Sequence, residues 1–295
     1  MSGPRAGKNG KVNRMEQTNM HDLALTAARS RLLAMEMVHR AASGHIGGSL
    51  SAMDILTELY FRVMRVNPEQ PRDPARDRFV LSKGHCTPAL YPTLAQRGFF
   101  PVERLKEFRR IDGQMSGHAE MHHVPGVDMS TGSLGQGVSA AAGMALAAKY
   151  QGKDCRIYTL LGDGEIEEGQ PWEAFMFAHQ YKLDNLCVII DNNNLQIDGK
   201  ITDVMSPYPI PEKLRAFGFQ VREIDGHDFE QMESAFDEAR ATKGVPFAII
   251  MTTIKGKGVS FMEDVAGWHG KAPNDEEYKT AMDELKARLA EVEGM

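Results

Sequence analysis

Residues 160–199, LLGDGEIEEGQPWEAFMFAHQYKLDNLCVIIDNNNLQIDG, decide the fold of this chain. An apolar run at residues 157–161 breaks at Gly162, Asp163 and Gly164, and a second run at residues 186–190 breaks at Asp191 and three asparagines. Short apolar runs followed by turn residues are typical of buried strands in parallel sheets. Ligands of open α/β sheets bind beyond the carboxyl ends of the strands, so we expect a site at these two breaks.

The segments on both sides of this stretch continue an alternation of helices and strands. The expected helices cover residues 23–42, 51–64, 89–96, 101–110, 138–150, 228–241 and 276–293, and the further expected strands cover residues 78–82, 219–224 and 247–253. Residues 112–132 show no periodicity and predict a long loop. The alternation predicts an α/β fold, with a mostly parallel central sheet and helices on both faces.

Composition is that of an ordinary globular protein. The chain has 295 residues, of which 42% are apolar and 25% charged, and its formal net charge is −6. The acidic balance argues against a nucleic-acid partner, and no apolar run is long enough for a membrane span. Three cysteines without C-x-x-C spacing, and no secretory signal, predict reduced thiols and a cytoplasmic location. We expect residues 1–19 to form a disordered lead and residues 20–295 a single domain.

Asp163 and Asn193 form a candidate cation site. They are separated by about one strand–helix–strand unit, which returns the chain to the same edge of a sheet. Carboxylate and amide oxygens suit Mg²⁺, which is often completed by the phosphates of a ligand. Glycines on both sides of Asp163 permit close approach of the backbone to a phosphate. Aspartate, asparagine and glycine are also common turn residues, so two ordinary turns fit the same spacing.

Four histidines have glycine neighbours in predicted loops: His45, His85, His118 and His269. Several imidazoles gathered in a cleft would move protons near neutral pH and bond to hydroxyls or phosphate. An ordinary surface or packing role is the alternative for each one. His227, in DGHD, is predicted to lie in a turn before a helix that Asp228 caps.

Two further features adjoin these motifs. The glycine-rich segment 131–137 precedes a helix, and the amides at a helix N-terminus bind anions. Glutamates at the start of the helix after Gly164 favour its positive end, and we expect Glu165 and Glu167 to lie on a solvated face.

Seven motifs occur in the order found in transketolases. They are SGHIGGSLSAMDILTELYF, DRFVLSKGHCTPALY, GHAE, STGSLGQG, LLGDGEIEEGQPWEA, IIDNNNLQIDG and WHGKAP. GDG followed by NN is shared by thiamine-diphosphate enzymes generally, whereas SKGH together with GHAE resembles transketolases in particular. Over nearly its whole length, the chain resembles the transketolase family, which implies a thiamine-diphosphate-binding fold.

The resemblance implies how the cofactor is anchored. Asp163, Asn193 and the carbonyl of Leu195 would be ligands of Mg²⁺, with Ca²⁺ or Mn²⁺ as substitutes. Asn193 would also contact the cofactor. Gly164 would offer its backbone to the diphosphate of thiamine diphosphate, together with His85.

The same resemblance implies roles closer to the reacting atoms. Gly132 and Leu134 would lie along the cofactor's aminopyrimidine and diphosphate. His45 and His269 would bind near its thiazolium and assist proton transfers. His118 would bond to the terminal hydroxyl of the donor sugar.

The family reaction is the transfer of a two-carbon ketol unit from a ketose phosphate to an aldose phosphate, and the cofactor carries its difficult step. The chain resembles only the first of three transketolase domains. The second, which supplies the glutamate that activates the aminopyrimidine, has no counterpart here. The resemblance therefore implies the N-terminal subunit of a split transketolase, with a separate C-terminal subunit in an α2β2 assembly and Glu168 at the dimer interface. We expect no turnover from this chain alone.

Other readings remain open at this point. One is a relative that acts on a specialised or sulfonated sugar, and another is an enzyme similar to 1-deoxyxylulose-5-phosphate synthase. A third is a cofactor-binding subunit without catalytic activity.

Overall fold

The computed structural model describes residues 18–295. The lead expected at residues 1–19 falls mostly outside the described residues, and only its last two positions are placed. Thr18 Oγ1 donates to the carbonyl of Phe61 at 3.0 Å. Asn19 caps helix α1 (Met20–Ala41), accepting a hydrogen bond from the Asp22 amide at 2.8 Å.

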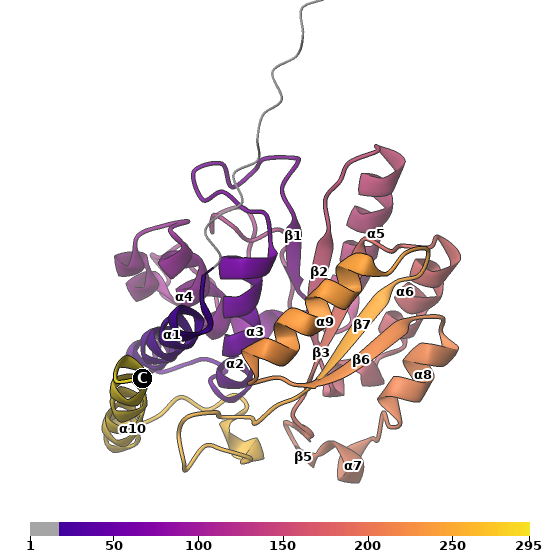
Figure 1. Ribbon diagram of the computed structural model, residues 1–295. Helices are drawn as coiled ribbons and strands as arrows, with labels where there is room; N and C mark the ends of the chain where they lie inside the picture. The colour runs from indigo at the N-terminus through magenta and orange to yellow at the C-terminus, as the bar shows by residue number, and fades with distance from the viewer. Residues whose placement is uncertain (1–17) are drawn as a thin grey trace, which may run out of the picture.

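Five parallel strands form the central sheet, in the order β1-β2-β3-β7-β6. The strands are β1 (Arg78–Leu81), β2 (Ile157–Gly162), β3 (Leu186–Asn192), β6 (Gln220–Asp225) and β7 (Phe247–Thr252). Because all five run the same way, their carboxyl ends lie at one edge (Figure 1). The predicted α/β fold with a parallel sheet is confirmed.

Side chains of successive strand residues enter two separate cores, as the alternation of a strand requires. Phe79, Leu81 and Tyr158 belong to the larger core, whereas Val80 and Ile157 belong to the smaller one. The helices of the larger core are α1, α3 (Met53–Glu58), α4 (Thr87–Arg97), α9 (Phe229–Ala241) and α10 (Asp275–Glu293), and those of the smaller core are α5 (Gln136–Tyr150), α6 (Gly169–Gln180) and α8 (Ile210–Ala216). Figure 1 shows α9 crossing in front of the strands and α10 beside α1.

Two predicted helices differ from the structure. The helix expected at residues 51–64 begins earlier and is broken into α2 (Gly47–Ser51), α3 and the π-helical turn η1 (Leu59–Val63). The helix expected at residues 101–110 is only a 3₁₀ segment, η3 (Val102–Glu107). Leu105 is the one buried residue of η3, so this segment lacks the apolar face that would stabilise a longer helix.

Short elements gather at the carboxyl edge of the sheet. They are η2 (Gly84–Cys86), η4 (Gly164–Glu167), the hairpin of β4 (Leu195–Gln196) and β5 (Gly199–Lys200), α7 (Ile201–Val204) and η5 (Ala266–Trp268). Between residues 18 and 295, no helix is long and apolar enough to cross a membrane.

Candidate active site at the carboxyl edge of the sheet

The two broken strands place Asp163 and Asn193 in neighbouring loops. Asp163 follows β2, and its amide donates to the carbonyl of Asp191, in β3, at 3.2 Å. One carboxylate oxygen of Asp163 accepts a hydrogen bond from the Asn194 amide at 2.5 Å. The side-chain oxygen of Asn193 accepts from the Leu195 amide at 3.2 Å. The loops therefore meet as their spacing predicts.

The Asp163 carboxyl group is buried beside a second carboxylate. It is only 2% exposed. Burial, together with the nearby Asp191 carboxylate, raises the pKa of Asp163 to about 7. A bound cation would favour the ionised carboxylate, and Asn193 and Leu195, on the loop that contacts Asp163 through Asn194, carry neutral oxygens. This oxygen-rich set fits a hard cation such as Mg²⁺. Within the described residues, no group of three or more His, Cys, Asp or Glu side chains forms a ready-made metal site.

Two buried lysines, which the sequence reasoning missed, supply positive charge. Lys255 Nζ donates to the Leu195 carbonyl at 3.0 Å and lies 3.0 Å from His269 Nδ1. Burial lowers the pKa of Lys255 to about 8. Lys83 donates to the Gly48 carbonyl at 3.0 Å and pairs with the Asp191 carboxylate. Burial opposes the charge on Lys83, but Asp191 raises its pKa above the ordinary value.

A sequence signal for these lysines existed. Lys83 and Lys255 each stand just after a strand, β1 and β7, at the same edge as Asp163. The segment that begins at Lys255 lacks the spacing of a P-loop, but its position after a strand was enough to indicate a place at this edge.

The four glycine-flanked histidines converge. The ring centroid of His45 lies 5.0 Å from that of His85, 5.5 Å from that of His269 and 5.9 Å from that of His118. His85 and His269 are 5.1 Å apart. His45, His85 and His269 are partly buried, whereas His118 is exposed. The structure thus brings together four loops that are widely separated in the sequence.

Burial lowers the pKa of all four rings, and the effect on His118 is reinforced by Arg109. Burial, followed by the charge of Arg109, lowers the pKa of His45 to about 4. Burial and the Lys255 ammonium lower the pKa of His269 to about 3. Burial and Lys83 likewise hold the pKa of His85 well below its ordinary value. Surrounding cations that suppress protonation also attract an anionic ligand to this edge.

One buried histidine nitrogen is left without a hydrogen bond. His45 Nδ1 is buried and has no hydrogen-bond partner among residues 18–295. Buried polar atoms are nearly always paired, so this nitrogen fits a ligand group placed in the site.

The long loop is held against the turn after β1. The Ala119 amide donates to the Gly84 carbonyl at 3.1 Å, and the Thr131 amide donates to the Ala119 carbonyl at 3.0 Å. A Cβ at Gly84 would lie 2.5 Å from Thr131 Oγ1, so only glycine permits this approach. A Cβ at Gly132 would lie 3.3 Å from His118 Cδ2, which places Gly132 against that ring. Leu134 follows on the same segment and is 37% exposed.

The expectation for Glu165 is wrong. Its side chain is buried, at 2% exposed, instead of lying on a solvated face. It accepts hydrogen bonds from Ser82 Oγ, from the Gly135 amide at 2.9 Å and from the Gly162 amide at 3.0 Å. Glu165 therefore links two glycine-rich loops. Its carboxylate also occupies the N-terminus of α5, where the sequence predicted amides that are free to bind an anion.

The remaining predicted residues lie at the rim of this region. Gly164 begins η4, and a Cβ added there would lie 3.3 Å from Gln196 Cβ. Glu167 accepts a hydrogen bond from Gln196 at 3.1 Å. Glu168 is exposed at the start of α6. A Cβ added to Gly135 would lie 3.2 Å from the Cβ of Glu168, so the two residues are close neighbours.

The fold and this edge define an α/β protein whose polar, cation-lined site suits an anionic ligand. Comparison with known proteins gives the family. Residues 23–289 match the family model described as "Transketolase, thiamine diphosphate binding domain". The chain belongs to the transketolase family, in the part that binds thiamine diphosphate.

Relatives that are themselves separate subunits match over almost their whole length. The chain is 45% identical to the 6-deoxy-6-sulfo-D-fructose transketolase subunit of Clostridium sp. (strain MSTE9), covering 90% of this chain and 96% of that protein. It is 44% identical to an apulose-4-phosphate transketolase subunit of Phocaeicola vulgatus, covering 92% and 96%. The predicted relationship to the N-terminal subunit of split transketolases is confirmed, as is the prediction of a transketolase enzyme.

Single-chain transketolases match over less than half of their length. Human transketolase is 42% identical over 87% of this chain, which corresponds to 41% of the human protein. The crystal structure of the Campylobacter jejuni transketolase superposes with a TM-score of 0.85 at 34% identity, covering 93% of this chain and 46% of that one. The likeness therefore extends to the arrangement of the elements that carry the site.

Proposed function

We propose that this chain is the diphosphate-binding subunit of a two-chain transketolase that uses thiamine diphosphate and Mg²⁺. The complete enzyme would transfer a two-carbon ketol unit from a ketose or its phosphate to an aldose or its phosphate. The observation that carries the proposal is the meeting of the Asp163 and Asn193 loops with Lys255 and four histidines at one sheet edge.

The oxygen-rich loops are proposed to hold the metal. Asp163 would give its carboxylate, Asn193 its side-chain oxygen and Leu195 its carbonyl, with Ca²⁺ or Mn²⁺ as substitutes for Mg²⁺. The raised pKa of Asp163 supports this role, because a bound cation would offset the burial and the Asp191 charge that disfavour the ionised carboxylate. The backbone of Gly164 and the side chains of His85 and Lys255 would face the diphosphate.

The histidines are proposed to handle protons and hydroxyls. When bound, thiamine diphosphate supplies a thiazolium that accepts the electron pair left by carbon–carbon cleavage. His45 and His269, held neutral by burial and nearby cations, would each accept or return a proton through a ring nitrogen. His118 is exposed, so it can meet the terminal hydroxyl of a donor sugar. Gly132 and Leu134 would lie beside the cofactor.

A separate C-terminal subunit is proposed to complete the site. Two relatives of matching length are named as subunits, and single-chain transketolases are more than twice as long as the matched region. We propose an α2β2 assembly with Glu168 at its interface, since Glu168 is exposed and lies beside Gly135. The three cysteines of this chain are free, which suits a reducing, cytoplasmic compartment.

The test is reconstitution. The purified chain is assayed for two-carbon transfer alone and with a candidate C-terminal transketolase subunit, while calorimetry follows thiamine diphosphate binding with Mg²⁺. We expect turnover only from the mixture. Turnover by this chain alone would contradict the split-site proposal. A mixture that binds the cofactor but never turns over any donor would favour a non-catalytic subunit.

The donor sugar needs a panel of substrates. Two relatives named for different donors, a sulfonated deoxyfructose and apulose 4-phosphate, are about equally similar to this chain. Both donors belong in the assay beside unmodified ketose phosphates. A 1-deoxyxylulose-5-phosphate synthase activity is the second reading, and pyruvate with an aldose phosphate tests it.

A further inference from the structure

We propose that His227 is a positioning residue for the candidate site. Held by Arg31 and Asp54, it fixes the backbone at Ile254 and thereby sets where the Lys255 ammonium lies. The identity of the ligand that Lys255 meets rests on the proposed function, but the contacts themselves do not.

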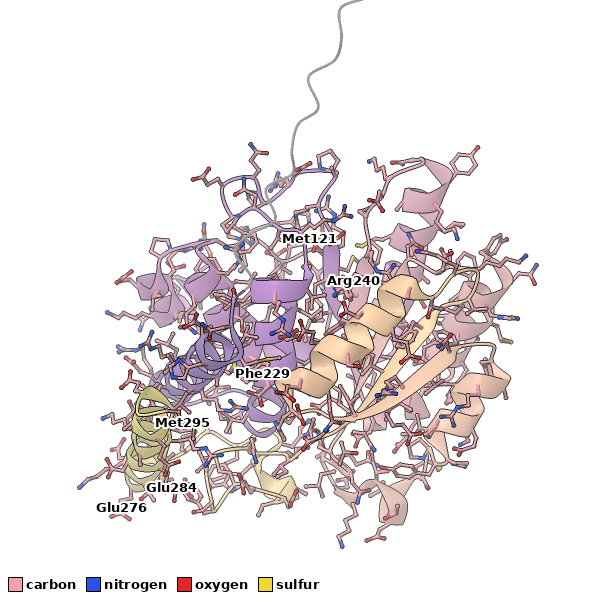
Figure 2. The ribbon with its side chains drawn as sticks, viewed as in Figure 1. Met121, Phe229, Arg240, Glu276, Glu284 and Met295 are labelled. Carbon is pink, nitrogen blue, oxygen red and sulfur yellow. The ribbon has the colours of Figure 1, made fainter. Side chains whose placement is uncertain are left out.

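His227 lies in the turn between β6 and α9, just before Phe229, which is labelled at the start of α9 in Figure 2. Its Nε2 accepts a hydrogen bond from the Ile254 amide at 3.0 Å. An accepting ring nitrogen carries no proton, so the proton of the neutral ring is on Nδ1. That nitrogen donates to Asp54 Oδ2 at 2.7 Å. The two partners thus select one tautomer and one orientation of the ring.

Asp54 is itself held in place. Arg31 binds it through two hydrogen bonds, of 2.9 Å to Oδ1 and 2.6 Å to Oδ2. All three side chains are nearly buried, with exposed fractions of 10% for Arg31, 8% for Asp54 and 12% for His227. Burial opposes ionisation of Asp54, but Arg31 and then His227 hold its pKa well below the ordinary value. A charged, bidentate pair in this setting gives the imidazole a rigid support.

The supported amide belongs to the residue before Lys255. Neighbouring backbone groups are anchored by other backbone groups: Thr253 donates to the Asn192 carbonyl at 3.2 Å, and Gly256 donates to the Gly47 carbonyl at 2.9 Å. The Ile254 amide instead donates to the His227 side chain, while the Ile254 carbonyl accepts a hydrogen bond from the Lys257 amide at 3.2 Å. The Lys255 carbonyl accepts a hydrogen bond from the Asp264 amide at 3.0 Å, so the His227 contact restrains the peptide on the other side of Lys255. We expect loss of that contact to loosen this peptide and to shift Lys255 Nζ from its positions 3.0 Å from the Leu195 carbonyl and His269 Nδ1.

Two substitutions separate the two contacts of the ring. In His227→Gln, the side-chain oxygen reaches the place of Nε2 and still accepts from Ile254. In His227→Asn, the shorter amide still donates to Asp54 but does not reach Ile254. His39→Asn is the matched control, because His39 also bonds to an aspartate, Asp275, at 2.9 Å and stacks on Tyr278.

The variants are compared in the assembled enzyme and as the isolated chain. In the assembled enzyme, we expect His227→Asn to weaken Mg²⁺-dependent thiamine diphosphate binding by about tenfold or more, as loss of an outer supporting contact does at other sites. His227→Gln should restore most of that affinity, and His39→Asn should leave it unchanged. In the isolated chain, hydrogen exchange at the Ile254 amide should accelerate in the Asn variant alone. Equal losses in the Asn and Gln variants that follow their melting temperatures would show a purely structural role and overturn the proposal.

A spectrum of the ring nitrogens provides a test that needs no cofactor. ¹⁵N NMR of the chain should show His227 as the Nδ1–H tautomer, and the Nε2–H tautomer would overturn the proposal. Should the wild-type complex bind no thiamine diphosphate, the proposed function fails. The tautomer and the exchange rate at Ile254 would still decide the positioning role.

Discussion

The ring centroids of His45 and His269 lie 5.5 Å apart at an interplanar angle of 88°, although the two residues are near opposite ends of the chain. Their loops meet because Gly47 lacks a side chain. A Cβ at Gly47 would lie 2.9 Å from the carbonyl oxygen of Trp268, the residue before His269. The absence of a side chain at Gly47 therefore lets the segments of His45 and His269 approach each other.

Removing the charge of Asp163 tests the metal site. Asp163→Asn keeps the shape of the side chain but removes the negative charge that a divalent ion needs. We expect Mg²⁺-dependent binding of thiamine diphosphate to the assembled complex to weaken by about 10- to 100-fold. Titration calorimetry measures the change.

The control for this experiment is Asp184→Asn. Asp184 precedes β3, at the opposite end of the sheet, and binds Lys149 at 2.7 Å. An unchanged dissociation constant in Asp163→Asn would contradict the metal assignment. An equal loss in both variants would mean that the effect is not specific to the site.

Truncating His118 tests substrate recognition. His118 is exposed at the rim, so His118→Ala should spare the buried anchors of the cofactor. We expect kcat/KM for the donor ketose to fall about tenfold, which corresponds to one hydrogen bond of about 1.4 kcal/mol. Thiamine diphosphate affinity should stay the same. Steady-state kinetics with varied donor, paired with calorimetry, measures both.

His122→Ala, in the same loop and also exposed, is the matched control and should behave like wild type. If donor kinetics of His118→Ala equal those of wild type, His118 does not contact the donor.

Changing Glu165 tests the link between the glycine-rich loops. In Glu165→Gln, the amide nitrogen must face the backbone amide of either Gly135 or Gly162, so one buried donor loses its acceptor. We expect the free energy of unfolding to fall by about 1–3 kcal/mol. Cofactor binding should weaken too, because both loops border the site.

Chemical denaturation and calorimetry check these two effects. Glu212→Gln, on the exposed face of α8, should change neither. A Glu165→Gln variant as stable as wild type would show that the loops hold together without this carboxylate.

The pH dependence of the free energy of unfolding should show the titration of Glu58. Its side chain is fully buried, and its Oε1 lies 3.2 Å from Arg62 Nε, while Arg62 also pairs with Glu233. Burial raises the pKa of Glu58 to about 7. The stability that its protonated form provides is therefore complete below about pH 4.5 and is lost as the pH rises through about 7.

In Glu58→Gln, the neutral amide should remove this dependence. Relative to wild type, we expect the variant to gain roughly 3 kcal/mol of stability between pH 4.5 and 7.5. Denaturant titrations across this pH range measure the difference in stability. Glu36→Gln is the control, because Glu36 forms an exposed ion pair with Arg40. Parallel stability curves for wild type and Glu58→Gln would show that Glu58 does not titrate in this window.

Much of the site could be predicted because apolar runs followed by turn residues indicate where strands end. Apolar runs that stop at Gly162 and Asp191 mark two neighbouring strands, and parallel strands must end at one edge. Glycine neighbours likewise marked His45 and His269 as loop residues. The roles assigned to them came from the family resemblance and stay predictions.

What the sequence determined by itself was the α/β class, the sheet's strands and the identity of the loops that carry chemistry, because periodicity and turn residues are local properties of the chain. The tertiary structure alone decided that Glu165 is buried between two loops, that Lys255 contacts the Leu195 carbonyl and that His227 supports Ile254. Each of these depends on contacts between segments distant in the sequence. Burial and hydrogen-bond partners of that kind follow from packing, which no local pattern records.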